Sequence, residues 1–271
     1  MKKELWASGY IYEPYIGRWS RAVASEFVAW LDVPDGKRWL DVGCGTGALA
    51  QCVLRDSAPE RVHGIDPSSG FVDYAKAHTS SRLASFEVGD AQALPITSGE
   101  FDAAIAGLVL NFVPKPERAV AEMRRAVCPG GTVAAYVWDY AGKMELMRYF
   151  WDAAVELDAD ARAHDEGVRF PLCQAKPLAA LFRVAGLANV EVRAIDVPTR
   201  FPDFDDYWTP FLGGQAPAPS YCMALNDKKR ARLRDHIRSK LPIGSDGSID
   251  LIARAWAVKG RVPTSARSPE S

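Results

Sequence analysis

The chain has 271 residues, 48% of them hydrophobic and 25% charged, which is enough for a sizeable buried core. Its formal net charge of -1 argues against a phosphate backbone or an anionic membrane surface as the main partner. No apolar run approaches the roughly 20 residues of a membrane span, and the charged first residues predict no secretory signal. The five cysteines form no CxxC pair, so we expect a cytoplasmic protein without a disulfide framework.

Short apolar runs alternate with helical stretches between residues 37 and 139. Such an alternation with short links predicts an α/β fold with a doubly wound, mostly parallel sheet. The expected strands are residues 38–42, 61–65, 83–88, 101–109 and 132–138; the expected helices are residues 48–56, 69–78 and 116–127; and residues 129–131 form an expected turn.

The spacing of these patterns lengthens beyond residue 139. Helices are expected at residues 144–157, 176–185 and 227–241, strands at 190–197 and 249–258, and a partly irregular insertion at 201–220. We expect one domain over residues 1–261, whose cofactor-binding half is residues 36–139. Helical insertions at about 140–171 and 201–248 would form a cap over the carboxyl edge of the sheet, and residues 262–271 a disordered tail.

A glycine-rich loop, Leu40-Asp41-Val42-Gly43-Cys44-Gly45-Thr46-Gly47, joins the first strand to the first helix. Glycines at this junction allow a tight turn and a close approach of the backbone to a ligand. Together with Ala48, Gly43 and Gly45 also satisfy the dinucleotide pattern G-x-G-x-x-A, so an NAD(P)-dependent oxidoreductase is an alternative interpretation.

Three aspartates follow the first three strands. Asp41 lies two residues before Gly43, where a carboxylate would repel a pyrophosphate but suits an ammonium group; a turn-capping role is the alternative. Asp66 lies 19 residues after Gly47 and is placed to accept both hydroxyls of a ribose, unless it only forms a turn. Asp90 could accept from an adenine amine, with the Ala91 amide donating to the ring, although Gly-Asp is also a common turn pair.

The runs LDVGCGTG, VHGIDPSSGFVDYA and FEVGDAQALPITSGEFDAAIAGLVLNFVPKPERAVAEMRRAVCPGGTV resemble class I S-adenosylmethionine-dependent methyltransferases. The resemblance covers residues 39–137 and is to the ubiquinone/menaquinone-biosynthesis-like (type 11) group. It implies a Rossmann-like, seven-stranded sheet with an antiparallel last strand and S-adenosylmethionine as cofactor, giving S-adenosylhomocysteine as product. By motif position it implies cofactor contacts for Asp41, Gly43, Gly45, Asp66, Asp90 and Ala91, and we expect Cys44, Gly47, Pro67, Gln92 and Leu108 to complete the site.

The N-terminal segment, residues 12–20, also resembles the start of many such proteins and would fold as a helix closing over the cofactor. Aromatic faces suit a sulfonium cation, and a guanidinium suits the methionyl carboxylate, so Tyr15 and Arg18 are further candidates for cofactor binding. The alternative is that these aromatic residues simply pack on the edge of the sheet.

Catalytic residues are less evident, because methyl transfer depends on alignment and exclusion of water and needs a base only when the acceptor must lose a proton. The end of the fourth strand has neither Asn-Pro-Pro-Tyr nor a histidine. Asn111 could orient a substrate there or cap a turn. Asp139 could act as a base or be a solvated strand-end acid, and Tyr140 could line a substrate pocket. No His/carboxylate cluster has ligand spacing, so we expect no metal.

The basic run at residues 228–234 lies on a predicted helix whose Leu233, Ile237 and Leu241 form an apolar stripe. A solvated face explains this run better than a nucleic-acid site does. We therefore predict a methyltransferase acting on an O, N or C atom of a small, apolar or aromatic molecule, with no nucleic-acid or membrane partner. The alternatives are the oxidoreductase and a non-catalytic S-adenosylmethionine-binding module.

Overall fold

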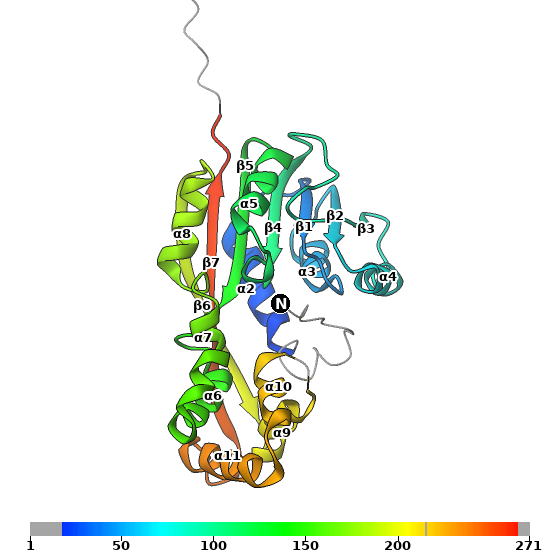
Figure 1. Cartoon of the computed structure of the whole chain (residues 1–271). Coiled ribbons are helices and arrows are strands. Elements are labelled where there is room, and N and C mark those ends of the chain that lie inside the picture. The colour runs from blue at the N-terminus through cyan, green and yellow to red at the C-terminus, as the bar shows by residue number, and fades with distance from the viewer. Residues whose placement is uncertain (1–17, 215, 265–271) are drawn as a thin grey trace, which may run out of the picture. The chain divides into compact units, whose positions relative to one another are not determined.

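The computed structural model describes residues 18–214 and 216–264. The chain divides into two compact units, which are described separately (Figure 1). The sheet unit comprises Ala24–Val137, Ala175–Ala194 and the described part of Trp256–Ser271. The helical unit comprises the described part of Met1–Val23, Trp138–Gln174 and Ile195–Ala255. The expected cap insertions fall within the helical unit, and their covering of the sheet edge stays a prediction.

Seven strands form one mixed sheet in the order β3-β2-β1-β4-β5-β7-β6. Strands β1 to β5 pair in parallel with their neighbours. The backbone N–H of Gly130 donates to Val262 and that of Asp139 to Arg254, so β7 runs antiparallel to β5, as the resemblance implies. The strands are β1 (Arg38–Val42), β2 (Arg61–Asp66), β3 (Ala84–Val88), β4 (Phe101–Gly107), β5 (Val127–Trp138), β6 (Ala188–Phe201) and β7 (Ile249–Arg261).

The central strands β1 and β4 are buried along most of their length, because helices cover a doubly wound sheet on both faces. Trp39, Leu40 and Val42 of β1 are fully buried, as are residues 103–106 of β4. Helices α3 and α4 contact β2, and α5 contacts β4 and α8. The helices that belong wholly or partly to this unit are α2 (Arg18–Leu31), α3 (Ala48–Asp56), α4 (Ser69–His78), α5 (Pro116–Ala126) and α8 (Ala175–Val184).

Local signals explain where these helices begin. The Ser68 hydroxyl accepts from the Phe71 backbone N–H and caps α4, whose predicted bounds are confirmed. Pro116 occupies the first turn of α5, where the missing N–H costs nothing. The predicted bounds of α3 are confirmed as well, and Gly47 precedes it in the left-handed conformation.

The predicted turn at residues 129–131 is wrong, because β5 already begins at Val127. Gly130 has φ +81°, and the register between β4 and β5 shifts in this stretch, as in a β-bulge. The Gly130 N–H donates to the Val262 carbonyl, and the Val262 N–H donates to the Gly131 carbonyl. Pairing with β7 therefore keeps the glycines in the sheet. Of the predicted tail, Val262 to Thr264 are described and Val262 is buried, while residues 265–271 lie outside the described residues.

The helical unit is built around aromatic side chains. The rings of Phe150 and Phe211 stack with centroids 4.5 Å apart, and the buried Tyr207 hydroxyl donates to the Leu146 carbonyl. The prediction of a partly irregular stretch at 201–220 needs correction, because burial of its aromatics and a cap at Asp203 stabilise short helices there. The elements are α6 (Glu145–Leu157), η3 (Ala159–His164), α7 (Glu166–Arg169), α9 (Phe204–Trp208), η4 (Thr209–Leu212), α10 (Pro217–Ala224) and α11 (Asp227–Lys240).

The basic helix α11 buries Leu233, Ile237 and the following Leu241, which confirms the predicted apolar stripe. Strands β6 and β7 extend beyond the predicted ranges of residues 190–197 and 249–258. They are neighbours in the sheet, and β7 also pairs with β5. In the described ranges, no helix is long and apolar enough to span a membrane.

Candidate functional site

The glycine loop follows β1 and is held in place by backbone hydrogen bonds. The N–H groups of Gly43 and Cys44 both donate to the Ile65 carbonyl, at 2.7 and 3.0 Å. Gly43, Gly45 and Gly47 all have positive φ values, of 73, 52 and 85°. Side chains other than glycine rarely adopt this region, so the loop requires these residues. Burial raises the pKa of the Cys44 thiol, so Cys44 stays neutral and serves the loop through its backbone.

The three glycines differ in what a side chain would meet. A Cβ atom on Gly43 would lie 2.5 Å from Val109 Cγ2, and one on Gly47 would lie 3.3 Å from the Cβ of Ala75. A Cβ atom on Gly45 would meet nothing within 4 Å. The chain itself therefore requires glycine at positions 43 and 47 by close packing, whereas Gly45 faces open space that a ligand can use.

Asp41 is buried at the end of β1 without a partner. Its side chain is 1% exposed, and neither carboxylate oxygen has a hydrogen-bond partner among the described residues. Burial raises the pKa of Asp41 to about 7; the backbone N–H of Ala50 opposes this rise without meeting hydrogen-bond geometry, and nearby Asp66 adds to it. The described chain thus gives the turn-capping alternative no full hydrogen bond, and the role of Asp41 toward a ligand stays a prediction. A buried carboxylate of this kind is stabilised by a cation.

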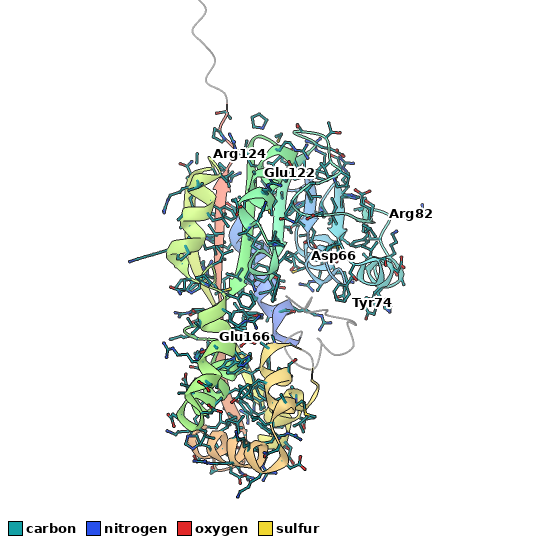
Figure 2. The ribbon with its side chains drawn as sticks, in the orientation of Figure 1. Asp66, Tyr74, Arg82, Glu122, Arg124 and Glu166 are labelled. Atoms are coloured by element: carbon teal, nitrogen blue, oxygen red, sulfur yellow. The ribbon has the colours of Figure 1, made fainter. Side chains whose placement is uncertain are left out.

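Asp66, labelled in Figure 2, ends β2. It already accepts two hydrogen bonds. Its Oδ2 accepts from the Gly45 N–H at 3.0 Å, and its Oδ1 accepts from the Ser68 N–H at 2.9 Å. Burial raises the pKa of Asp66, and these two N–H groups oppose the rise. Because a carboxylate offers about four lone-pair positions, each oxygen can accept one further hydrogen bond. The following Pro67 is exposed.

Asp90 lies beyond the end of β3 and is exposed. Its Oδ1 accepts from the Gln92 backbone N–H at 2.9 Å, and both of its oxygens accept from the Gln92 side-chain amide. The turn that the Gly-Asp pair indicated is therefore present. Ala91, between these residues, is buried. Contacts of this turn with adenine stay a prediction.

The segment after β4 contains two unusual residues. Leu108 has φ +60°, although it is not a glycine, and its N–H donates to the Tyr136 carbonyl at 2.8 Å. Such backbone strain occurs preferentially at functional sites. Asn111 lies in a single 3-10 turn, Leu110–Phe112, and its side-chain Nδ2 is buried with no hydrogen-bond partner among the described residues.

The remaining candidates belong elsewhere. Asp139 and Tyr140 are part of the helical unit. Asp139 is buried rather than solvated, and its Oδ2 accepts from the Lys143 N–H at 3.0 Å. Tyr140 is buried, and its carbonyl accepts from Arg148. Tyr15 lies outside the described residues, as does the side chain of Arg18.

Two glycines that support the site were not singled out from the sequence. A Cβ atom on Gly64 would lie 2.5 Å from the Phe86 ring, and one on Gly107 would lie 2.7 Å from the Tyr136 hydroxyl. A glycine inside a strand often marks such a close approach, and this was the available signal. Where the chain is described, no three His, Cys, Asp or Glu residues gather closely enough to hold a metal ion.

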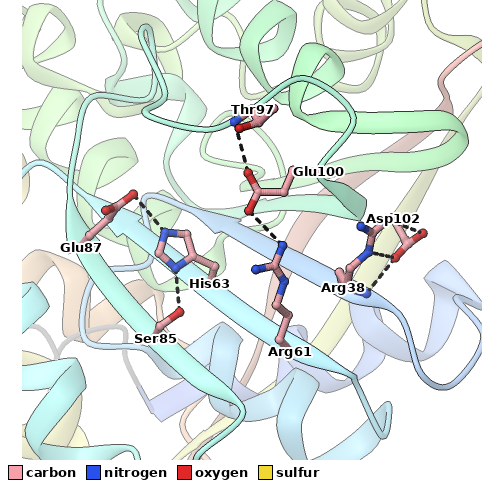
Figure 3. Close-up of polar contacts among 8 residues, drawn as sticks. All are labelled: Arg38, Arg61, His63, Ser85, Glu87, Thr97, Glu100 and Asp102. Carbon is pink, nitrogen blue, oxygen red and sulfur yellow. Dashed lines mark hydrogen bonds and ion pairs between the residues drawn. The ribbon is translucent and has the colours of Figure 1, made fainter.

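A second polar cluster, the paired network, links side chains of neighbouring strands (Figure 3). Its arginines lie at the amino ends of β1 and β2: Arg38 Nε donates to Asp102 Oδ2 at 2.8 Å, and Arg61 Nη2 donates to Glu100 Oε1 at 2.9 Å. His63 bonds to both Glu87 and Ser85. Ligands of doubly wound sheets bind outside the carboxyl ends of the strands, so this network serves the fold and the glycine loop forms the site.

Comparison with known families agrees with this geometry. Residues 40–135 match the model of a methyltransferase domain. This part of the chain is therefore similar to methyltransferase domains. The chain is 27% identical over 186 residues to a ubiquinone/menaquinone biosynthesis C-methyltransferase of Desulfotalea psychrophila, covering 65% of this chain and 74% of the relative. It is 34% identical over 93 residues to a malonyl-[acyl-carrier protein] O-methyltransferase of Hahella chejuensis, covering 34% of this chain and 33% of the relative.

The chain matches at most about a third of the length of the first three curated relatives. Among solved structures, phosphoethanolamine N-methyltransferase 2 of Haemonchus contortus, in complex with S-adenosyl-L-methionine, has a TM-score of 0.58 and 15% identity. That match covers 94% of this chain and 56% of the other. At this identity the likeness shows the fold.

Proposed function

We propose that this protein transfers a methyl group from S-adenosylmethionine to an O, N or C atom of a small, apolar or aromatic molecule. The observation that carries the proposal is the pair of buried, unpartnered oxygens of Asp41. An ionised carboxylate in such a place is costly unless a cation completes it. The methionyl ammonium group of the cofactor is a cation of suitable size.

The same observation argues against a dinucleotide at this loop. A pyrophosphate brings negative charge to the carboxyl ends of the strands, where it would face the buried Asp41 and Asp66. Asp66 suits either cofactor, because ribose hydroxyls are common to both. Asp41 therefore separates the methyltransferase from the oxidoreductase.

The residues around Asp41 fit the other parts of the cofactor. Gly45 leaves open space where the methionyl chain would pass, and Asp66 retains one acceptor position on each oxygen for the two ribose hydroxyls. When bound, S-adenosylmethionine supplies a methyl group activated by a positively charged sulfur. The chain would orient that group, and the segment from Leu108 to Phe112 would hold the acceptor in line with it.

The nature of the acceptor rests on the residues beside this segment. Val109, Leu110 and Phe112 are apolar, and Phe112 is 39% exposed although it is large. Such a surface favours an apolar or aromatic acceptor. The names of the relatives, which include a C-methyltransferase and an O-methyltransferase, support carbon and oxygen as acceptor atoms.

Thermal shift and calorimetry with S-adenosylmethionine, S-adenosylhomocysteine, NAD and NADP test the proposal. A ligand that binds only the folded state stabilises it by RT ln(1 + [L]/Kd), so the first two should raise the Tm and the nucleotides should not. Asp41→Asn should abolish most of the shift, whereas the exposed Asp73→Asn on α4 is the matched control. Stabilisation by NAD alone would reject the proposal.

A turnover assay separates an enzyme from a binding module. Formation of S-adenosylhomocysteine, followed by mass spectrometry over a library of small aromatic and acyl compounds, should exceed the background with at least one of them. Cofactor binding without turnover on any compound would favour the binding module.

A further inference from the structure

The side chain of Asn111 has a hydrogen-bond donor that the described chain leaves unused. Its Nδ2 is buried, and no described residue accepts from it. A buried donor without a partner costs free energy, so such groups are rare unless something else completes them. The surrounding residues Leu110 and Phe112 are apolar and offer no side-chain acceptor.

The backbone turn that carries this side chain is held by its neighbours. The Val109 side chain covers Gly43, since a Cβ atom there would lie 2.5 Å from it. The Phe112 N–H donates to the Val109 carbonyl at 2.8 Å, which closes the turn that contains Asn111. Leu108, at φ +60°, is anchored to Tyr136. Asn111 is therefore held in a short, rigid turn beside the glycine loop.

We infer that Asn111 donates its amide N–H to an oxygen of the methyl acceptor, and that the acceptor is an apolar molecule bearing a hydroxyl, carbonyl or carboxylate oxygen. This inference rests on the proposed function, because it places the acceptor next to the glycine loop. An N–H donor requires a lone pair on its partner, and an oxygen supplies one. A protonated amine is itself a donor and would leave the Asn111 N–H unpaired. Asn111 is thus a positioning residue that selects the acceptor by chemical class.

The test uses a set of probes that share one ring system. Protein saturated with S-adenosylhomocysteine is titrated with 2-naphthol, 2-naphthaldehyde and 2-naphthoate, and with 2-methylnaphthalene and protonated 2-(aminomethyl)naphthalene as probes without an accepting oxygen. At least one oxygen probe should bind about threefold to tenfold more tightly than 2-methylnaphthalene, the range expected of one hydrogen bond. Equal or tighter binding of the methyl and ammonium probes would overturn the inference.

Asn111→Leu removes the donor at similar volume. We expect it to abolish the preference for oxygen probes and leave the Kd of S-adenosylhomocysteine within about twofold, since a residue without cofactor contact changes that Kd little. Its Tm without ligand should rise, because an unpaired buried donor has been replaced by an apolar group. Gln51→Leu is the matched control, because the amide of Gln51 is already paired with Thr79. A preference retained in Asn111→Leu, or lost equally in Gln51→Leu, would overturn the inference.

Asn111→Asp keeps the shape and removes the donor. This variant should bind 2-naphthoate more weakly than 2-naphthol, because two carboxylates repel. Unchanged 2-naphthoate binding would show that position 111 does not face the acceptor. If the parent protein binds no S-adenosylhomocysteine, the proposed function itself fails; if it binds the cofactor but shows no oxygen preference, only the assignment of Asn111 fails.

Discussion

Asp102 and Asp41 lie toward opposite ends of two neighbouring strands. They differ in whether the described chain supplies a cationic or hydrogen-bonding partner for the carboxylate. Asp102, near the start of β4, accepts from Arg38 at 2.8 and 3.2 Å. These hydrogen bonds lower the pKa of Asp102 to about 2. Asp41, near the end of β1, has no partner among the described residues, and burial raises its pKa to about 7.

The contrast extends to the residues around each aspartate. In the paired network, Arg61 and His63 have acidic partners in the chain itself, although the buried Nε of Arg61 and the nearby Nε1 of Trp39 have no hydrogen-bond partner among the described residues. At the other end, both carboxylate oxygens of Asp41 and the Nδ2 of Asn111 are unpaired within the described chain. The charges of the paired network are thus neutralised by the chain, whereas the carboxylate of Asp41 has no cationic partner among the described residues. Substitutions should separate these two roles.

The largest effect on cofactor binding is expected for Gly45→Val. The residue has φ +52°, which a β-branched side chain tolerates badly, and its side chain would enter the open space above the loop. We expect no measurable binding of S-adenosylhomocysteine by calorimetry, with the circular dichroism spectrum unchanged. Normal affinity in a folded variant would show that the ligand lies elsewhere.

Asp41→Asn should weaken S-adenosylhomocysteine binding by about a hundredfold, because breaking a buried ion pair costs roughly 3–5 kcal/mol. The parent should also show a pH dependence that the variant lacks. Below the pKa of about 7, Asp41 is protonated and must release its proton to meet an ammonium group, so affinity should rise with pH and level off above 7. Titrations between pH 5.5 and 8.5 measure this, and a flat profile in the parent would contradict the assignment.

The same aspartate should lower the stability of the ligand-free protein. Because its folded pKa is raised, Asp41 contributes stability that is fully present below its unfolded pKa of 3.8 and is lost as the pH rises through about 7. The shift corresponds to at most roughly 4 kcal/mol at 1.4 kcal/mol per pKa unit. Asp41→Asn should therefore have a higher Tm than the parent at pH 8 without ligand. A lower Tm would mean that the chain itself uses the carboxylate.

Asp66→Ala should weaken S-adenosylhomocysteine binding at least about tenfold, since each hydrogen bond to a charged acceptor is worth roughly 1.5–3 kcal/mol. Loss of its bonds to Gly45 and Ser68 will loosen the loop as well. Adenine, which has no ribose hydroxyls, serves as a comparison ligand, and for it the parent and the variant should differ less. Equal losses for both ligands would show that Asp66 only shapes the loop.

The smallest effect on binding is expected in the paired network. Asp102→Asn removes an ion pair that is 19% exposed on the acidic side, and pairs of this kind contribute up to about 1 kcal/mol. We expect a slightly lower Tm, which converges with that of the parent as the pH falls from 3.8 towards 2, and a Kd for S-adenosylhomocysteine within about twofold. A tenfold loss of affinity would show that Asp102 also affects ligand binding, and would contradict the assignment of separate roles to the two ends of the sheet.

Local signals were sufficient for the elements that surround the loop. The bounds of β1, α3 and α4 follow from apolar runs, glycines and the Ser68 cap, because each signal acts within a few residues. The order of the glycines and the aspartates that follow successive strands also indicated the family and the edge of the sheet that carries the site.

Other features depend on residues far apart in the chain. Pro129, Gly130 and Gly131 signalled a turn, but pairing with Val262 keeps them in β5. The close approach of Gly64 to Phe86 and of Gly107 to Tyr136 exists only once strands have paired. That Asp41 and Asn111 lack partners is likewise a tertiary property: a sequence shows which groups can form hydrogen bonds, but only the packed chain decides which of them remain unpaired.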